Sequence, residues 1–333
     1  MLVSPEPHFY DSKQIFPSRG TVLFMLAHQA FAPSFPAQPE ADATDASKPP
    51  RPLTADDAVA TLMAGHQQFR KWVSRLHHPS GEPEAEALRS TAMVRELFPE
   101  DHVPVQEPFA IAVGCADSRV PLRMLFGSVV NDLFEVRVAG QVLADECVGS
   151  IEYALHHLPS VKTIVVLGHS DCGAVRAAVD NYLDPCCLKT EEMSIGFRSI
   201  VNHMLGAILQ SDRSLQIVAA ETNTPLSPEQ YQACLLEAVV AINAATIAHR
   251  IAYLTAKQGR DDLKVVYGVY DLLSHGIVHP SNEPQDPSWQ LGLVEAPATS
   301  ADVTTTALAA CRAAIASPAR TSDQPSNHHA GCC

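Results

Sequence analysis

Two short segments of the 333-residue sequence carry side chains that bind metals in proteins. The first is CADSR (115–119) and the second is HSDCG (169–173). Cys115, His169 and Cys172 together offer two thiolates and one imidazole, a donor set that suits tetrahedral Zn²⁺. Three protein ligands leave the fourth position open, which is typical of a catalytic zinc site. The motifs therefore predict a zinc enzyme with one Zn²⁺ per subunit.

Two other interpretations of these residues stay open. A cysteine at the end of a strand is most often a small buried apolar residue, and we expect that role for Cys147 and Cys234. A closed structural zinc site would need a fourth strong ligand, for which Asp117 is the only obvious candidate. Two soft-ligand motifs that occur together favour zinc ligation by Cys115 and Cys172.

Asp117 and Arg119 are spaced to form a charge-assisted, bidentate pair in a tight loop. The pair would fix the orientation of the carboxylate and keep its pKa low. The carboxylate is then placed to accept a hydrogen bond from the water of a zinc site. The alternative is a salt bridge that only stabilises the loop.

Four short and almost continuously apolar runs indicate strands that are buried on both faces, as in a parallel sheet. They are FAIAVG (109–114), LFEVRV (133–138), TIVVLG (163–168) and LKVVYGVY (263–270). Helical periodicity is found over 55–75, 145–157, 173–182 and 228 to about 257. The alternation predicts an α/β fold with a mainly parallel central sheet, flanked by helices.

The two motifs each begin where a predicted strand ends. Ligands of open α/β sheets collect outside the carboxyl ends of the strands, so both motifs are expected at one edge of the sheet. Cys172 would then open the helix over 173–182. The positive end of that helix dipole is expected to lower the pKa of the Cys172 thiol.

Three regions flank or interrupt the predicted catalytic domain, residues 54–280. Residues 1–53 are expected to form a disordered leader, although 13–32 have the weak outline of a secretory signal. Residues 183–227 are predicted to be an insertion with a helical patch near 195–210. Residues 281–333 are predicted to be a mostly disordered extension with a short helix near 302–315. A further helix is expected to end near Leu97. The terminal segment HHAGCC (328–333) is expected to be either inert or a scavenger of metal ions.

The composition excludes several classes of function. The formal net charge is −14, from 37 acidic and 23 basic residues, so neither nucleic acid nor an anionic membrane is an expected partner. No apolar run approaches the roughly 18 residues that span a bilayer. Nine cysteines in a long chain do not fit a small secreted disulfide scaffold. A reducing, cytoplasmic location is therefore expected.

The motifs and their surroundings resemble the β-class carbonic anhydrases. The resemblance covers roughly 55–182 and 228–280. It is carried by LMAGHQQF (62–69), GCADSRVP (114–121), LFEVRVAG (133–140), SIEYALHHL (150–158), VVLGHSDCGAV (165–175) and VYGVYDLLSHGIV (266–278).

This resemblance implies a four-stranded, mainly parallel sheet with an added antiparallel strand, in a homodimer or higher homo-oligomer with the active site at a subunit interface. It implies reversible hydration of CO₂ to bicarbonate and a proton. Cys115, His169 and Cys172 match the zinc ligands. Asp117 and Arg119 match the orienting pair, and Asp117 can itself occupy the fourth zinc position at rest. The positions that match substrate-binding residues are Gln106, Phe134, Ala139, Tyr153 and Gly173.

The sequence departs from the family pattern at two places near the motifs. Val138 stands where the family usually has Asn. Ala112 stands where some bacterial members have the Trp of an inhibitory bicarbonate pocket, so no such pocket is expected.

Two thiolate ligands should make zinc a weaker Lewis acid than three imidazoles do, so activity should rise with pH. An enzyme for another linear substrate, such as carbon disulfide, and a non-catalytic zinc protein remain the alternatives.

Overall fold

The computed structural model describes residues 51–77, 103–184, 194–260, 262–281, 283 and 286–317. Internal contacts divide the chain into two units, Met1–Pro50 and Arg51–Cys333, and every described residue belongs to the second. The predicted helix ending near Leu97, the tail at 328–333 and nearly all of the leader lie outside the described residues.

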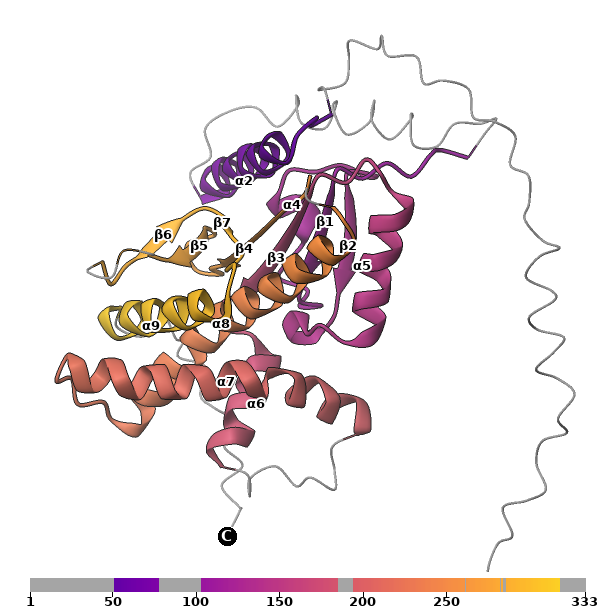
Figure 1. Ribbon diagram of the computed structural model, residues 1–333. Coiled ribbons are helices and arrows are strands. Elements are labelled where there is room, and N and C mark those ends of the chain that lie inside the picture. The colour runs from indigo at the N-terminus through magenta and orange to yellow at the C-terminus, as the bar shows by residue number, and fades with distance from the viewer. Residues whose placement is uncertain are drawn as a thin grey trace, which may run out of the picture. The chain divides into compact units, whose positions relative to one another are not determined.

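The described strands form one sheet in the order β2-β1-β3-β4-β5-β6, with β7 also paired to β4 (Figure 1). The first four strands in this order run parallel, whereas β5, β6 and β7 are added antiparallel. This architecture confirms the predicted fold class, with two more antiparallel strands than expected. The strands are β1 (Ala110–Gly114), β2 (Leu133–Arg137), β3 (Thr163–His169), β4 (Lys264–Tyr270), β5 (Ile277–Pro280), β6 (Trp289–Leu291) and β7 (Val294–Glu295).

Helices cover both faces of the parallel strands, which is why β1 and β3 are buried along their whole length. Successive side chains of a strand point to opposite faces. Ala110 and Ala112 accordingly pack with residues of α2 (Ala55–His77) and α4 (Leu122–Leu125). Ile111 and Val113 pack with α5 (Asp145–His157) and α8 (Pro228–Lys257). Figure 1 shows α8 running across its face of the sheet.

Helix α2 approaches the loop after α4 very closely. A Cβ atom on Gly65 would lie 1.8 Å from the carbonyl oxygen of Phe126, so only glycine permits this approach. The next residue, His66, is buried and joins two segments: its Nδ1–H donates to the Leu125 carbonyl (2.9 Å), and its Nε2 accepts from the Ile277 N–H (3.1 Å). Together these contacts fix α2 on the sheet.

A second helical layer packs against α8. It contains α6 (Gly173–Leu183) and α7 (Ile195–Glu221), which follow β3, and α9 (Ser300–Ala316), which follows β7. Helix α7 has 27 residues, so it extends well beyond the helical patch predicted near 195–210. Residues 286–299 contain β6 and β7, so the expectation of a mostly disordered extension is wrong for them, whereas the short helix predicted near 302–315 is found as α9. Buried alanines of α9 pack against α8, which explains why this segment is ordered.

Helix α8 is the one described helix that is long and apolar enough to cross a membrane by length and composition. However, 67% of its most apolar window is buried inside the protein. Its start is a capping box of Ser227 and Gln230 with Pro228 in the first turn. The burial shows that α8 serves as a core helix between the sheet and the second helical layer.

Candidate metal centre

The ends of two neighbouring strands bring the motifs together. In the parallel pair β1–β3, Gly114 lies opposite Leu167. Cys115 follows directly after β1, and His169 is the last residue of β3. Cys172 is the N-cap of α6, three residues further on. The carboxyl edge of the sheet therefore holds all three predicted donors.

Cys115, His169 and Cys172 form what we term the ligand cluster. Their ligand atoms all lie within 4.8 Å of one another, and the two sulfur atoms are 3.9 Å apart. Tetrahedral zinc with two Zn–S bonds of the usual length requires a sulfur–sulfur separation of about 3.8 Å. The residues are 4%, 0% and 4% exposed, respectively. The spacing, burial and donor types thus fit a tetrahedral metal ion.

The imidazole of His169 is oriented for metal binding. Its Nδ1–H donates to the carbonyl oxygen of Ser170 (2.9 Å), which leaves the lone pair on Nε2. Nε2 is buried and has no hydrogen-bond partner among the described residues. An orphaned buried nitrogen is costly unless something binds it, and a backbone partner on the other ring nitrogen is usual for a metal ligand.

The two thiols of the ligand cluster affect each other's pKa strongly, because their sulfur atoms are 3.9 Å apart. The hydrogen bond from Cys172, and after it the contact with His169, lower the pKa of Cys115 to about 4. The Gly140 N–H also donates to the Cys115 sulfur (3.2 Å). The same pairing raises the pKa of Cys172, as does burial, although the N–H groups of the first α6 turn lower it. The N–H groups of the first α6 turn act in the predicted direction, but the pairing with Cys115 and burial outweigh them, so the pKa of Cys172 is raised.

Asp117 and Arg119 form the predicted bidentate pair beside the ligand cluster. Arg119 Nε and Nη2 donate to the two carboxylate oxygens at 3.1 and 2.8 Å, and its backbone N–H donates at 2.8 Å. These bonds lower the pKa of Asp117 to about 2 and raise that of Arg119. Asp117 Oδ2 lies 3.8 Å from His169 Nε2, so an ionised, oriented carboxylate faces the ligand cluster.

Three residues that support the cluster had no role in the sequence interpretation. The Arg137 guanidinium donates to the carbonyl oxygens of Cys115 (2.9 and 3.0 Å) and Asp117 (2.8 Å). The Asn243 amide holds the Gly140 carbonyl (2.9 Å), and Gly140 adopts a positive φ of 66° that suits glycine. The only sequence signal for them was the phrase RVAG (137–140); nothing in the sequence linked Asn243 to it.

The predicted substrate-binding residues are not brought together within one chain. Ala139 precedes Gly140 at the cluster, and Gly173 follows Cys172. Phe134 and Tyr153 instead pack on each other, with ring centroids 6.4 Å apart, on β2 and α5. Gln106 is exposed and precedes β1, at the edge of the sheet where the strands begin. Ala139 and Gly173 therefore adjoin the ligand cluster, whereas Phe134, Tyr153 and Gln106 lie on β2, on α5 and before β1.

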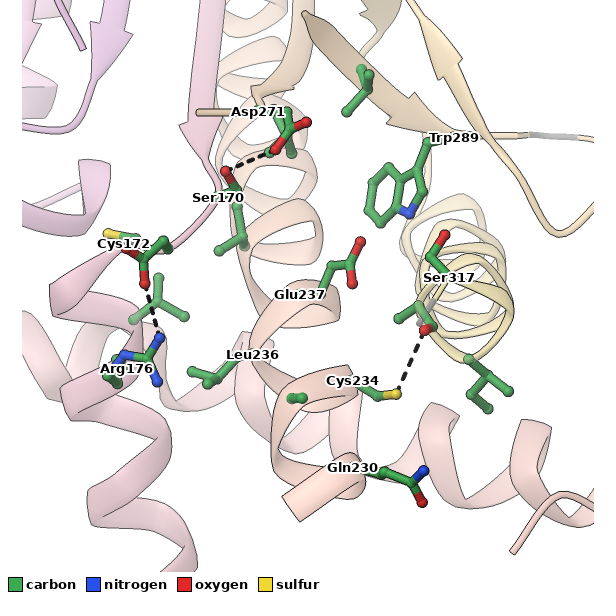
Figure 2. Close-up of a pocket in the computed structure, with 18 of the residues that line it drawn as sticks. Ser170, Cys172, Arg176, Gln230, Cys234, Leu236, Glu237, Asp271, Trp289 and Ser317 are labelled. Carbon is green, nitrogen blue, oxygen red and sulfur yellow. Dashed lines mark hydrogen bonds and ion pairs between the residues drawn. The ribbon is translucent and has the colours of Figure 1, made fainter. Parts of the chain in front are cut away.

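A cavity of about 300 Å³ lies between the second motif and the helices α8 and α9, which contribute lining residues. Ser170, Asp171 and Cys172 contribute to its wall, and Figure 2 shows Glu237 and Trp289 on other sides of it. Neither the other two members of the ligand cluster nor any predicted substrate-binding residue lines it. It is therefore distinct from the predicted substrate pocket.

The fold and the ligand cluster define an α/β protein in which side chains that could hold a metal ion lie at the carboxyl ends of parallel strands. The family model described as "Carbonic anhydrase" matches residues 110–277, half of the chain, and this range contains the whole ligand cluster. The chain belongs to this family, in its β class.

Two curated relatives illustrate the similarity. A carbonic anhydrase of Mycolicibacterium smegmatis is 44% identical over 105 residues, which are 31% of this chain and 48% of that protein. Carbonic anhydrase 2 of Mycobacterium tuberculosis is 51% identical over 74 residues, which are 22% of this chain and 35% of that protein. The chain thus matches less than half the length of either relative.

The solved structures that are similar to this chain include the β-carbonic anhydrase CcaA, for which the comparison gives a TM-score of 0.43 at 19% sequence identity. That comparison covers 68% of this chain and 92% of CcaA.

Proposed function

We propose that the protein is a zinc-dependent carbonic anhydrase that catalyses CO₂ + H₂O ⇌ HCO₃⁻ + H⁺. The observation that carries this proposal is the buried ligand cluster with an ionised Asp117 carboxylate 3.8 Å from His169 Nε2. Stopped-flow measurement of CO₂ hydration by the zinc-loaded protein tests it.

The residues divide the work between metal binding and orientation. Cys115, His169 and Cys172 would hold one Zn²⁺, which acidifies water and so supplies hydroxide near neutral pH. Asp117 accepts a hydrogen bond from the attacking oxygen and directs its lone pair at the carbon of CO₂. Arg119 keeps that carboxylate ionised and fixed in plane through its two side-chain bonds. The reaction then needs little reorganisation around the nucleophile.

We also propose a homodimer or higher homo-oligomer in which each subunit completes its neighbour's substrate pocket. Gln106, Phe134 and Tyr153 lie away from the ligand cluster of their own chain, and Tyr153 is 51% exposed. A second copy could supply these side chains beside Ala139 and Gly173. Light scattering on the purified protein should give a mass of at least two chains; a monomer with full activity would contradict this arrangement.

The pH dependence of the reaction should be a single rising limb. The pKa of Asp117 is about 2 because Arg119 binds its ionised form. A carboxylate is charged above its pKa, so Asp117 keeps its charge from pH 6 to 9 and adds no limb there. Zinc with two thiolate ligands acidifies water less than zinc with three imidazoles, for which the water pKa is about 7. We therefore expect kcat to rise between pH 6.5 and 9, and a bell-shaped profile would disagree.

A further inference from the structure

Arg119 is held by a second carboxylate besides Asp117. Its Nη1 donates to Asp171 Oδ2 (3.2 Å), and its Nη2 donates to the backbone oxygen of Asp171 (3.1 Å). A guanidinium has five N–H donors in one plane. Four of them are used on two aspartates, so Asp171 fixes the edge of Arg119 that faces away from Asp117.

Asp171 is in turn held by Arg176. Arg176 Nη2 donates to Asp171 Oδ1 (2.9 Å), the oxygen that Arg119 does not use. Asp171 has a positive φ of 54°, and Arg176 lies in the first turn of α6, where its N–H bonds to the Cys172 carbonyl (2.9 Å). Figure 2 shows Arg176 next to Cys172 at one side of the cavity. Four side chains thus form a row of alternating charges that is anchored to α6: Asp117, Arg119, Asp171 and Arg176.

We propose that Asp171 and Arg176 are positioning residues that act on the reaction through Arg119. This inference rests on the proposed function. The Arg119 side chain is 49% exposed, and a single exposed ion pair holds a long side chain weakly. Bonds to Asp171 remove the rotational freedom that would let Arg119 leave Asp117. Displacement of an orienting group by about 1 Å is enough to cost up to roughly 100-fold in rate.

Kinetics of two substitutions test the role. In Asp171→Asn, which keeps a residue that tolerates positive φ, and in Arg176→Met, kcat should fall roughly 10-fold with KM unchanged. Arg176→Lys should restore part of the loss. The matched control is Arg312→Met, which breaks the remote Arg312–Glu221 pair (3.2 Å) and should leave kcat unchanged. In an Arg119→Ala background, Asp171→Asn should have no further effect.

Zinc content distinguishes positioning from mere support of the Cys172 loop. Each variant should bind one zinc as tightly as wild type in competition with a chelator. A fall in kcat that follows a loss of zinc would overturn the proposal, as would an unchanged kcat in both Asp171→Asn and Arg176→Met.

A readout that does not depend on activity separates this proposal from the proposed function. The crystal structure of zinc-loaded Asp171→Asn should show the Arg119 guanidinium displaced from Asp117, with Cys115, His169 and Cys172 unmoved. Arg119 still bonded to both oxygens of Asp117 would overturn the positioning role. If wild type fails to hydrate CO₂, the proposed function fails, and this structural comparison still decides what holds Arg119.

Discussion

Substitution of Cys172 by alanine is expected to remove zinc and CO₂ hydration together. The variant would keep only one thiolate and one imidazole for a metal that prefers four ligands. Changes to groups that merely support a zinc ligand already cost 10- to 100-fold in metal affinity, so loss of a ligand should lower the affinity by more than roughly 100-fold. Zinc content by mass spectrometry after dialysis against a chelator measures this loss.

The matched control for this substitution is Cys147→Ala. Cys147 is buried in the core formed with α5, its pKa is raised by burial, and it lies outside the ligand cluster. This variant should retain one zinc per chain and normal activity. Full zinc retention by Cys172→Ala would show that the three residues are not a ligand set.

Asp117→Ala is expected to lower kcat by roughly 100- to 1000-fold, the range seen when one preorganised hydrogen-bonding group is removed from an active site. Zinc should stay bound, because Asp117 is not one of the three grouped ligand atoms. The loss arises because no carboxylate then orients the attacking oxygen. Stopped-flow kinetics and zinc content on the same samples measure both quantities.

The chain contains a natural control for the Asp117–Arg119 pair. Arg260 and Asp262 have the same two-residue separation and the same bidentate contact, at 2.8 and 3.1 Å, on a loop before β4. Asp262→Ala should leave kcat unchanged. If Asp117→Ala likewise changes only the thermal stability and not kcat, the pair is a loop-stabilising salt bridge and the catalytic role assigned to Asp117 is wrong.

The sequence predicted the elements whose apolar residues follow the pattern of a buried strand or the spacing of a helix. Strands β1 to β4 are mainly apolar because helices cover both faces, and α5 begins and ends where the periodicity indicated. The second half of α7 was missed because its polar residues are satisfied by partners that the sequence does not reveal. Ser211 bonds within its own helix (2.7 Å), and Asp212 accepts from Tyr182 (3.0 Å) and Tyr231 (2.6 Å) on neighbouring helices.

Strands β6 and β7 have only three and two residues. Segments this short carry no readable alternation, and their pairing depends on the exposed edge that β4 and β5 provide. These two strands could therefore be recognised only from the folded structure, whereas the sequence already indicated a helix near 302–315, where α9 lies.

The ligand cluster was predictable because each motif directly follows a strand, and parallel strands place their carboxyl ends at one edge. The supporting contacts were not predictable in the same way. Asn243 reaches Gly140 from a helix more than 100 residues later, and Arg176 reaches Asp171 only because of the backbone turn at that residue. No hydrogen bond or ring contact among the described residues joins Gln106, Phe134 or Tyr153 to the ligand cluster, which is why we propose that a second copy completes the pocket.

Stopped-flow CO₂ hydration at pH 8.5 tests the central claim most directly when it is run on three forms of one preparation: zinc-loaded, zinc-stripped and reloaded. We predict that the loaded form, with one zinc per chain, accelerates proton release from CO₂ hydration, that stripping abolishes the acceleration, and that added Zn²⁺ restores it. Carbon disulfide should be assayed in parallel, because its turnover without CO₂ turnover would assign another linear substrate to the site. A protein that binds one zinc per chain and yet leaves CO₂ hydration at the uncatalysed rate would contradict the claim.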